Sequence, residues 1–389
     1  MEKGHKQTAA AAVFCTIIML ITAASDALRG VFLPQFERSF SLDKAQSSLI
    51  ITVSYIGNLL FLFIGGYLSD RLPRKKFLGC VLGMWCLALT AYVFTESYSV
   101  LLCGMIFSMG GSTMISTSVN LVTPLLFMSP ALMVNLFNFS QGVGITLTQN
   151  IGGRFAESLS AWHVINGILL GLALVCAVLL IFLRLPDPEK PKRSVIASYK
   201  QILRSPASIL LILVTGCYFI AEHGLQNWLV SYGSQHLGFS VGDSAFYLSL
   251  FFGGITVGRL IFAPLVQKLG IARSMVIFSS LAAVLYAVGI LMRGNGMYVI
   301  AASGLAFSVL YPTLVLLIAG HFDTSLAGAA TGFILSLATI FDIAFNALFG
   351  TLVKNSGYSS PILLLPAAMI LFAAGLWLKP VRTLKDSKG

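Results

Sequence analysis

Five charged side chains lie inside long apolar stretches of the sequence: Asp26, Arg29, Glu222, Arg259 and Asp342. An ionised side chain at the centre of a bilayer costs about 2.5–3.5 kcal/mol on insertion scales, so each of them needs a structural or functional reason. A buried carboxylate beside a cation can alternate between its protonated and ionised forms, because burial disfavours the charge and the cation favours it. The chemistry these residue types indicate is proton coupling.

Asp26 and Arg29 are three residues apart, so on a helix they occupy neighbouring positions of one face. The pair can carry a proton, or it can be a static ion pair that fixes helix packing. Glu222 and Asp342 are the rival proton carriers. Arg259 lies near the middle of its apolar stretch, and we interpret it as a structural or gating residue.

The stretch around residue 222 also has the groups that a sugar-like solute needs. Glu222 and Gln226 are one turn apart, and His223 and Asn227 form the next row, so two adjacent stripes of this helix are polar. Trp228 follows, and an aromatic ring beside hydrogen-bonding groups suits a solute with CH and OH groups. The alternative for Trp228 is an anchor at the membrane interface.

The other candidates for solute binding are four amides and a hydroxyl: Asn138, Gln141, Ser116, Asn120 and Asn346. Asn138 and Gln141 share a helix face, and Asn346 follows Asp342 by one turn. Small polar groups of this kind also hydrogen bond between helices, which is their commoner use in membranes. We expect about half of them to contact solute.

Membrane-spanning helices must position these residues. Of 389 residues, 57% are hydrophobic and 10% are charged, against about a quarter charged in a soluble domain. The apolar blocks are continuous and about 20 residues long, which favours helices that cross the bilayer. The fold class is therefore an all-α membrane protein with twelve transmembrane helices. The predicted spans are 11–33, 46–69, 77–95, 99–122, 132–154, 163–183, 209–232, 244–267, 273–292, 297–319, 328–351 and 359–379.

The lysines and arginines predict the orientation of these spans. With both termini in the cytoplasm, the inner segments hold 18 Lys and Arg residues and the outer loops hold five. This asymmetry predicts that both termini face the cytoplasm. We expect the membrane to be a plasma membrane, the inner membrane of a bacterium. The asymmetry also accounts for the net charge of +11, which is then no argument for nucleic acid binding.

A polar stretch, 184–208, divides the chain into two halves. We predict a six-helix bundle over 1–185, a cytoplasmic linker over 186–208 and a second six-helix bundle over 209–389. The other loops are short, so no soluble domain is left for an enzyme active site. Two similar bundles around a central cavity are the arrangement that alternating-access carriers use.

The segment from Gly66 to Lys76 resembles the loop signature of the major facilitator superfamily, which has Gly, three residues, Asp-Arg, one residue, Gly and then basic residues. Here Asp70 and Arg71 match, and Pro73 replaces the second Gly. Gly258 and Arg259 carry part of the same pattern in the second half. We expect Asp70 to latch the inner side electrostatically, with Arg71 and Arg259 as further gating residues.

A closer resemblance is to the proton-coupled L-fucose permeases and their sugar-symporter relatives. It is carried by the segment Asp26–Phe36, which includes Leu-Pro-Gln-Phe, by 138–141, and by 222–228. The resemblance implies that Asp26 takes part in proton coupling. These permeases have a Glu where this chain has Ser116, so the alternatives are a different solute or a second carboxylate such as Glu222 or Asp342.

Other functions fit less well. A proton-driven antiporter that exports drugs or metabolites usually has Gly-Pro in its fifth span, where Thr148 and Gln149 stand here beside Gly144, Gly152 and Gly153. A membrane enzyme would need nucleophile, base or metal groups at one depth. A sensor without transport is the third alternative. We predict no cofactor, no metal and no nucleic acid partner; the expected partners are a small solute, protons and the bilayer, and the chain is expected to be a monomer.

Overall fold

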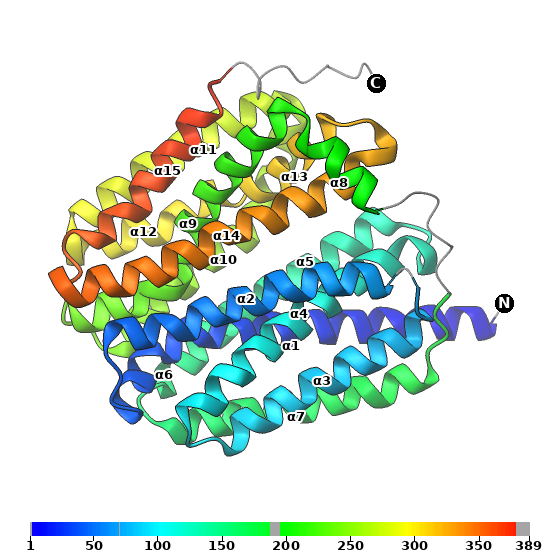
Figure 1. Cartoon of the computed structure of the whole chain (residues 1–389), viewed down its shortest axis with the longest axis horizontal. Helices are drawn as coiled ribbons and strands as arrows, with labels where there is room; N and C mark the ends of the chain where they lie inside the picture. Colours follow the sequence, from blue (N-terminus) through cyan, green and yellow to red (C-terminus); the bar gives the residue numbers. More distant parts are fainter. Residues whose placement is uncertain (1, 70, 187–194, 379–389) are drawn as a thin grey trace. The chain divides into compact units, whose positions relative to one another are not determined.

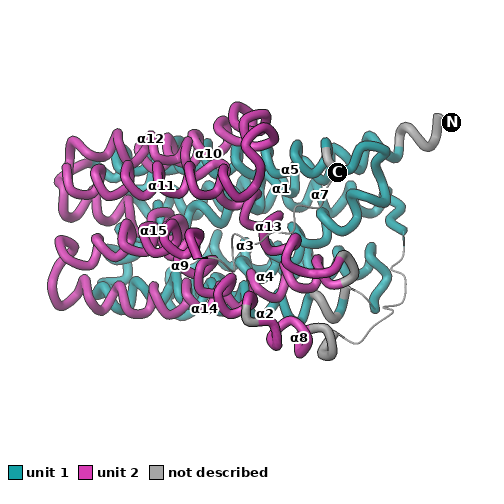
Figure 2. Tube along the Cα trace, turned by 90° about the horizontal axis from the view of Figure 1, so that it is seen from above, with its two compact units in different colours: residues 1–191, 240–246 teal, residues 192–239, 247–389 magenta. Residues whose placement is uncertain are grey.

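The computed structural model describes residues 2–69, 71–186 and 195–378, and every regular element among them is a helix (Figure 1). The chain divides into two compact units, residues 1–191 with 240–246 and residues 192–239 with 247–389 (Figure 2). Each unit is described by itself.

The helices of the first half follow the predicted spans closely. They are α1 (Glu2–Ser39), α2 (Lys44–Ser69), α3 (Arg74–Phe94), α4 (Tyr98–Leu126), α5 (Pro130–Leu147), the π-helical turn η1 (Thr148–Gly152), α6 (Gly153–Phe155) and α7 (Leu159–Phe182). The fifth span is therefore α5, η1 and α6 in sequence. A π-helical turn inserts an extra residue into a helix and bends it, and such turns are frequent at functional sites.

The second half begins with a short helix, and its tenth and twelfth spans are each divided between two elements. The helices are α8 (Val195–Leu203), α9 (Pro206–Gln235), α10 (Val241–Leu269), α11 (Ile271–Leu291), η2 (Arg293–Gly296), α12 (Met297–Phe307), α13 (Leu310–Gly320), α14 (Thr324–Ser356), η3 (Pro361–Leu363) and α15 (Leu364–Gly375).

Ten stretches of these helices are long and apolar enough to cross a membrane. The fifth span, α5 to α6, and the shorter apolar segment Pro361–Gly375 complete the predicted set. The fold class predicted from the sequence is thus confirmed, and the chain is an integral multi-pass membrane protein.

The two halves repeat the same helix pairs. In unit 1, α1 packs on α5 and α7, and α3 packs on α4 and α7. In unit 2, the corresponding spans make the corresponding pairs, with α9 on α14 and α15, and α11 on α12 and α15. This repetition explains why the sequence motifs of the first half return in the second.

The short helix α8 occupies part of the predicted linker. Tyr199 stacks on Phe333 of α14 with ring centroids 4.2 Å apart, and Ile202 is buried with Ala330. The segment 195–203, which lies inside the predicted cytoplasmic linker 186–208, is therefore docked on unit 2 through apolar contacts. Residues 187–194 lie outside the described residues.

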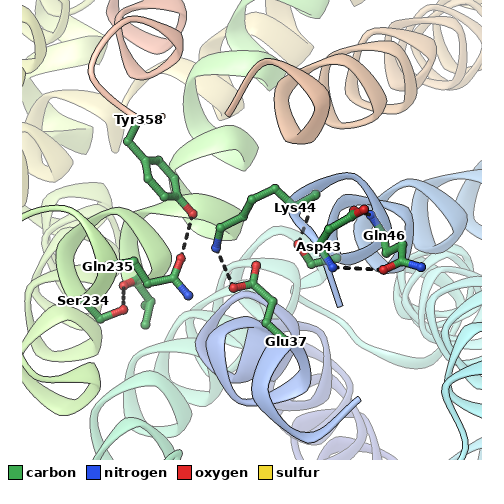
Figure 3. Close-up of polar contacts among 9 residues, drawn as sticks. Glu37, Asp43, Lys44, Gln46, Ser234, Gln235 and Tyr358 are labelled. Atoms are coloured by element: carbon green, nitrogen blue, oxygen red, sulfur yellow. Dashed lines mark hydrogen bonds and ion pairs between the residues drawn. The ribbon is translucent and has the colours of Figure 1, made fainter. Parts of the chain in front are cut away.

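Polar contacts fix the turn between α1 and α2 (Figure 3). The backbone N–H of Gln46 donates to Asp43 Oδ1 at 2.8 Å, and the backbone N–H of Asp43 donates to Gln46 Oε1 at 2.9 Å. These reciprocal bonds form a capping box at the start of α2. Lys44 Nζ pairs with Glu37 Oε2 at 2.5 Å, which ties the start of α2 to the end of α1. In unit 2, the Tyr358 hydroxyl donates to Gln235 Oε1 at 3.1 Å, a contact drawn as a dashed line in Figure 3.

Candidate functional site

Asp26 is the centre of a polar network inside unit 1. Ser112 of α4 donates a hydrogen bond to Asp26 Oδ2 at 2.5 Å, so the carboxylate of α1 is bound from a neighbouring helix. Arg29, one turn further along α1, attracts the same carboxylate electrostatically. Both interactions stabilise the ionised form, and the apolar surroundings oppose it.

Arg29 is itself held by two other helices. Its side chain is only 3% exposed, and its guanidinium lies over the ring of Tyr55 of α2, 4.8 Å from the centroid. Nη2 donates to the Tyr55 hydroxyl at 3.4 Å, and Nη1 lies 3.6 Å from the sulfur of Met109. The attraction between the guanidinium and the aromatic ring offsets part of the hydration free energy that the cation loses on burial, so Arg29 can be buried here.

A small cavity opens beside these two residues. It has room for about one water molecule. It is lined by Ser25, Asp26, Arg29, Ser54, Tyr92, Met105, Ser108, Met109 and Trp162. Hydroxyl and charged groups occupy part of its wall, so the cavity has the polar partners that a water molecule or a proton-transfer path requires.

The candidates for solute binding in unit 1 lie one turn away on α4 and α5. Gln141 Nε2 donates to Ser116 Oγ at 2.9 Å, and Ser116 also lies 3.5 Å from the sulfur of Met19. Asn138 is half-buried and Asn120 is exposed. The structure therefore brings Ser116 of α4 and Gln141 of α5 together. Ser116 lies one turn after Ser112 on α4.

In unit 2, a carboxylate of α14 meets a histidine of α9. His223 Nδ1 lies 2.9 Å from Asp342 Oδ2, with Asp342 1% exposed and the His223 side chain 26% exposed. The imidazole also stacks on Phe219, one turn earlier on α9, at a centroid distance of 4.7 Å. Asp342 is thus not isolated in the apolar interior, because a titratable partner lies across the helix pair.

Of the polar residues that follow on α9, Gln226 is half-buried, whereas Asn227 and Trp228 are fully buried. The indole Nε1 of Trp228 donates to Asn346 Oδ1 of α14 at 2.8 Å, and the Asn346 amide donates to the carbonyl of Asp342 at 2.8 Å. These contacts link α9 to α14 inside the unit. Gln226 is the member of the group that faces accessible space.

Glu222 points toward a different set of neighbours. The Tyr218 hydroxyl donates a hydrogen bond to it, and both Tyr218 and Tyr311 lie within electrostatic range of Glu222 and Arg259. Within the described part of the chain, the buried Nε of Arg259 has no hydrogen-bond partner. Arg259 therefore lies at the depth of Glu222, among tyrosines, rather than at a loop.

The basic loop after α2 is described only in part. Asp70, the predicted latch, lies outside the described residues, and Arg71 is exposed. Lys75 donates to the carbonyl of Ile181 at 2.6 Å, and Arg74 donates to the carbonyl of Pro186 at 2.9 Å. Lys75 thus binds the C-terminal end of α7, where the helix dipole favours positive charge, and Arg74 binds the segment that follows this helix.

Sequence reasoning did not identify the partners of Ser112, Tyr218 or His223. For Ser112 a signal was available in the sequence: Ser108, Ser112 and Ser116 are spaced four residues apart, which puts all three on one face of α4. Nothing in the sequence pairs His223 with a residue so far along the chain. Among the described residues, no three His, Cys, Asp or Glu side chains come together as metal ligands.

Comparisons with known proteins agree with this architecture. The family model of the Major Facilitator Superfamily matches residues 15–345. The L-fucose-proton symporter of Escherichia coli is 22% identical over 343 residues, covering 78% of each chain. The glucose/galactose transporter of Brucella abortus is 23% identical over 326 residues, covering 77% of each.

Solved structures share the fold over almost the whole chain. The fucose:proton symporter of E. coli superposes with a TM-score of 0.70 at 18% identity, covering 94% of this chain and 97% of that one. A D-xylose-proton symporter gives a TM-score of 0.78 at 15% identity, covering 95% and 97%. At such identities the likeness concerns the fold.

Proposed function

The chain belongs to the Major Facilitator Superfamily and is a transporter; from this premise we propose that it is a proton-coupled symporter of a small polar solute, a sugar or sugar-like molecule. The observation that carries the proposal is the Asp26 network in unit 1. Its carboxylate has one short bond from Ser112 and one cation nearby, so protonation can compete with these two contacts. A carrier needs such a group to load and release a proton in differently exposed states.

We assign proton coupling to Asp26 and Arg29, with Glu222 and Asp342 as the rival carboxylates. Loss of the proton from Asp26 leaves a charge that Ser112 and Arg29 stabilise. Gain of the proton removes the attraction between Asp26 and Arg29 and leaves Arg29 with its contacts to Tyr55 and Met109. A change of protonation at Asp26 therefore alters how α1 is held against α2 and α4. That mechanical link is what alternating access requires.

We assign solute binding to the amides and hydroxyls near this network, and to their counterparts in unit 2. Ser116, Asn120, Asn138 and Gln141 supply hydrogen-bonding groups in unit 1, and their partial exposure supports the assignment. In unit 2 we retain Gln226, Asn227, Trp228 and Asn346, of which Gln226 is the accessible one and the others support its helix. The sugar relatives named above favour a hydroxyl-rich solute.

The proposed working unit is a monomer in a bacterial inner membrane with both termini in the cytoplasm. The bundles 1–185 and 209–389 alternate access around the linker 186–208. Asp70, Arg71 and Arg259 act as gating residues.

The experiment uses the purified protein in proteoliposomes that are acidic outside and alkaline inside. Radiolabelled L-fucose, D-galactose, D-glucose and D-xylose are tested for uptake against their own gradients. We expect accumulation of at least one of them that collapses when a protonophore removes the pH gradient. Extrusion under the same gradient would instead identify the antiporter.

Asp26→Asn is the decisive variant, because Asn imitates the protonated carboxyl group. We expect it to retain exchange of solute across the membrane and to lose accumulation driven by the pH gradient. Glu222→Gln is the matched comparison. If Asp26→Asn still accumulates solute while Glu222→Gln does not, Glu222 is the carrier and Asp26 is half of a structural ion pair.

A further inference from the structure

We propose that His223 and Asp342 form a second proton-binding site, in unit 2, in which the imidazole takes up the proton and the carboxylate positions and stabilises it. The site joins two helices: His223 Nδ1 of α9 lies 2.9 Å from Asp342 Oδ2 of α14. Neither the loop signature nor the Asp26 network includes His223. The proposal rests on proton-coupled transport only for its second test below.

If the carboxylate of Asp342 is ionised, as the proposal has it, its contact with Nδ1 determines which ring nitrogen exchanges the proton. A carboxylate accepts hydrogen bonds, so the nitrogen that faces it, Nδ1, carries a hydrogen. In the neutral ring the other nitrogen, Nε2, is then the basic one. The exposure of the two side chains also differs: Asp342 is 1% exposed and His223 is 26% exposed. His223, which has the basic nitrogen, is therefore the residue that reaches accessible space.

The balance of charge makes proton uptake change the state of the helix pair. With a neutral ring the dyad carries one negative charge in an apolar interior; with a proton on Nε2 it becomes an ion pair with no net charge. A buried charge without a counter-charge is costly, and the opposite charge on the adjacent imidazole offsets part of that cost. Asp342 Oδ1 adds to the cost of the unprotonated state, since it is buried without a hydrogen-bond partner among the described residues.

Close packing of α9 on α14 keeps the two groups in register. Gly224, next to His223, faces Phe345, and an added Cβ atom there would lie 3.0 Å from the Phe345 ring and 2.4 Å from Leu365 of α15. Asn346 of α14, bound to Trp228 of α9, fixes the next turn. The distance between the imidazole and the carboxylate is therefore set by the helix pair and changes if the helices separate.

The other ionisable groups around His223 do not duplicate this role. On α9 itself Glu222 is bonded to Tyr218, and Tyr311 of α13 and Arg259 of α10 face that same set. From α11, Tyr286 donates to the carbonyl of Ala221 at 3.2 Å. The helix α15 has no ionisable side chain, and α8 packs at Phe333. Asp342 is the charged group of α14 that meets the imidazole.

The first test needs no solute. The whole chain is labelled with ¹⁵N-histidine, which labels only five imidazole rings, and placed in nanodiscs of phosphatidylethanolamine and phosphatidylglycerol. Comparison with His223→Asn identifies the signals of the His223 ring.

We expect a neutral ring protonated at Nδ1 at alkaline pH that gains a second proton at Nε2 on acidification. In Asp342→Asn the second proton should need at least a tenfold higher proton concentration, and Asp26→Asn should leave the titration unchanged. A neutral ring protonated at Nε2, or a ring that stays neutral down to pH 5, overturns the proposal.

The second test measures accumulation of the four sugars in proteoliposomes. His223→Asn keeps an amide donor near the carboxylate and removes the base, so we expect at least a tenfold loss of proton-driven accumulation with exchange retained. His163→Asn is the control, because that ring bonds to the carbonyl of Thr95. If His223→Asn accumulates sugar like the wild type while Asp26→Asn does not, the proposed function stands and the second proton site is wrong. If the wild type accumulates none of the sugars, the proposed solute is wrong and the titration of His223 still decides the site.

Discussion

Three serines of α4 connect that helix to three different neighbours. Ser108 hydrogen bonds with Tyr92 of α3, Ser112 donates to Asp26 of α1, and Ser116 accepts from Gln141 of α5. Other hydroxyls of the same helix bond to their own backbone, as Ser118 does to the carbonyl of Met114. The stripe formed by 108, 112 and 116 therefore links the proton-coupling candidate to the solute-binding candidates through one face.

Ser112→Ala tests this link at the residue scale. It removes the donor that stabilises the ionised form of Asp26, and hydrogen bonds to charged groups contribute about 1.5–3 kcal/mol. We expect proton-driven uptake to fall about tenfold, with solute exchange less affected and Ser112→Thr restoring much of the loss. Ser118→Ala is the control and should behave like the wild type. Equal losses in the two alanine variants would mean that the effect is on helix stability.

The sequence predicts which charged residues lie inside the membrane, but it does not predict which residues of other helices they contact. Hydropathy placed Asp26, Glu222 and Asp342 inside the membrane, because a charge interrupts an apolar run wherever it lies. Which helix each one faces depends on rotation and packing, which the sequence of one helix does not contain. His223 therefore appeared in the sequence only as part of a polar row, and its partner is 119 positions away. For Trp228 the sequence left two alternatives, and the structure shows its indole bonded to Asn346.

Helices were predictable in number and type because each is a continuous apolar block of the length that a bilayer requires. Their interruptions were not. The π-helical turn Thr148–Gly152 and the division of the tenth span between α12 and α13 arise from local packing, which apolar content does not record. The same holds for α8: its contacts with Phe333 and Ala330 depend on a surface formed by another helix.

Close approach of α1 and α5 depends on Gly144. A Cβ atom at this position would lie 2.2 Å from the carbonyl oxygen of Leu20, a backbone atom that cannot rotate away. We expect Gly144→Val to force the two helices apart, at a cost of about 1–3 kcal/mol or more, and to lower the melting temperature measured by intrinsic fluorescence in detergent. Gly171→Val on α7 is the matched control, since nothing lies within 4 Å of a Cβ there. Equal melting temperatures for both variants would contradict this packing.

For the whole molecule, the basic residues have two separate roles. Arg74 and Lys75 bind carbonyls at the end of α7 and in the segment that follows it, so part of the charge in that loop also stabilises the bundle. The overall excess of Lys and Arg on one set of loops, 18 against five, is the basis of the predicted orientation with both termini in the cytoplasm. The first role is local and visible in contacts, whereas the second depends on the sum over all loops.

The orientation can be tested with two substitutions that leave this charge distribution unchanged. Gln201 is exposed on α8, and Asn355 is exposed near the end of α14. In a background in which the six native cysteines are replaced by alanine, we expect Asn355→Cys to react with a membrane-impermeant maleimide on intact cells. Gln201→Cys should react only after the membrane is permeabilised, because the positive linker around it remains in the cytoplasm. The reverse pattern would place the termini outside, and the charge asymmetry would then need a cause other than orientation, such as the carbonyl contacts of Arg74 and Lys75.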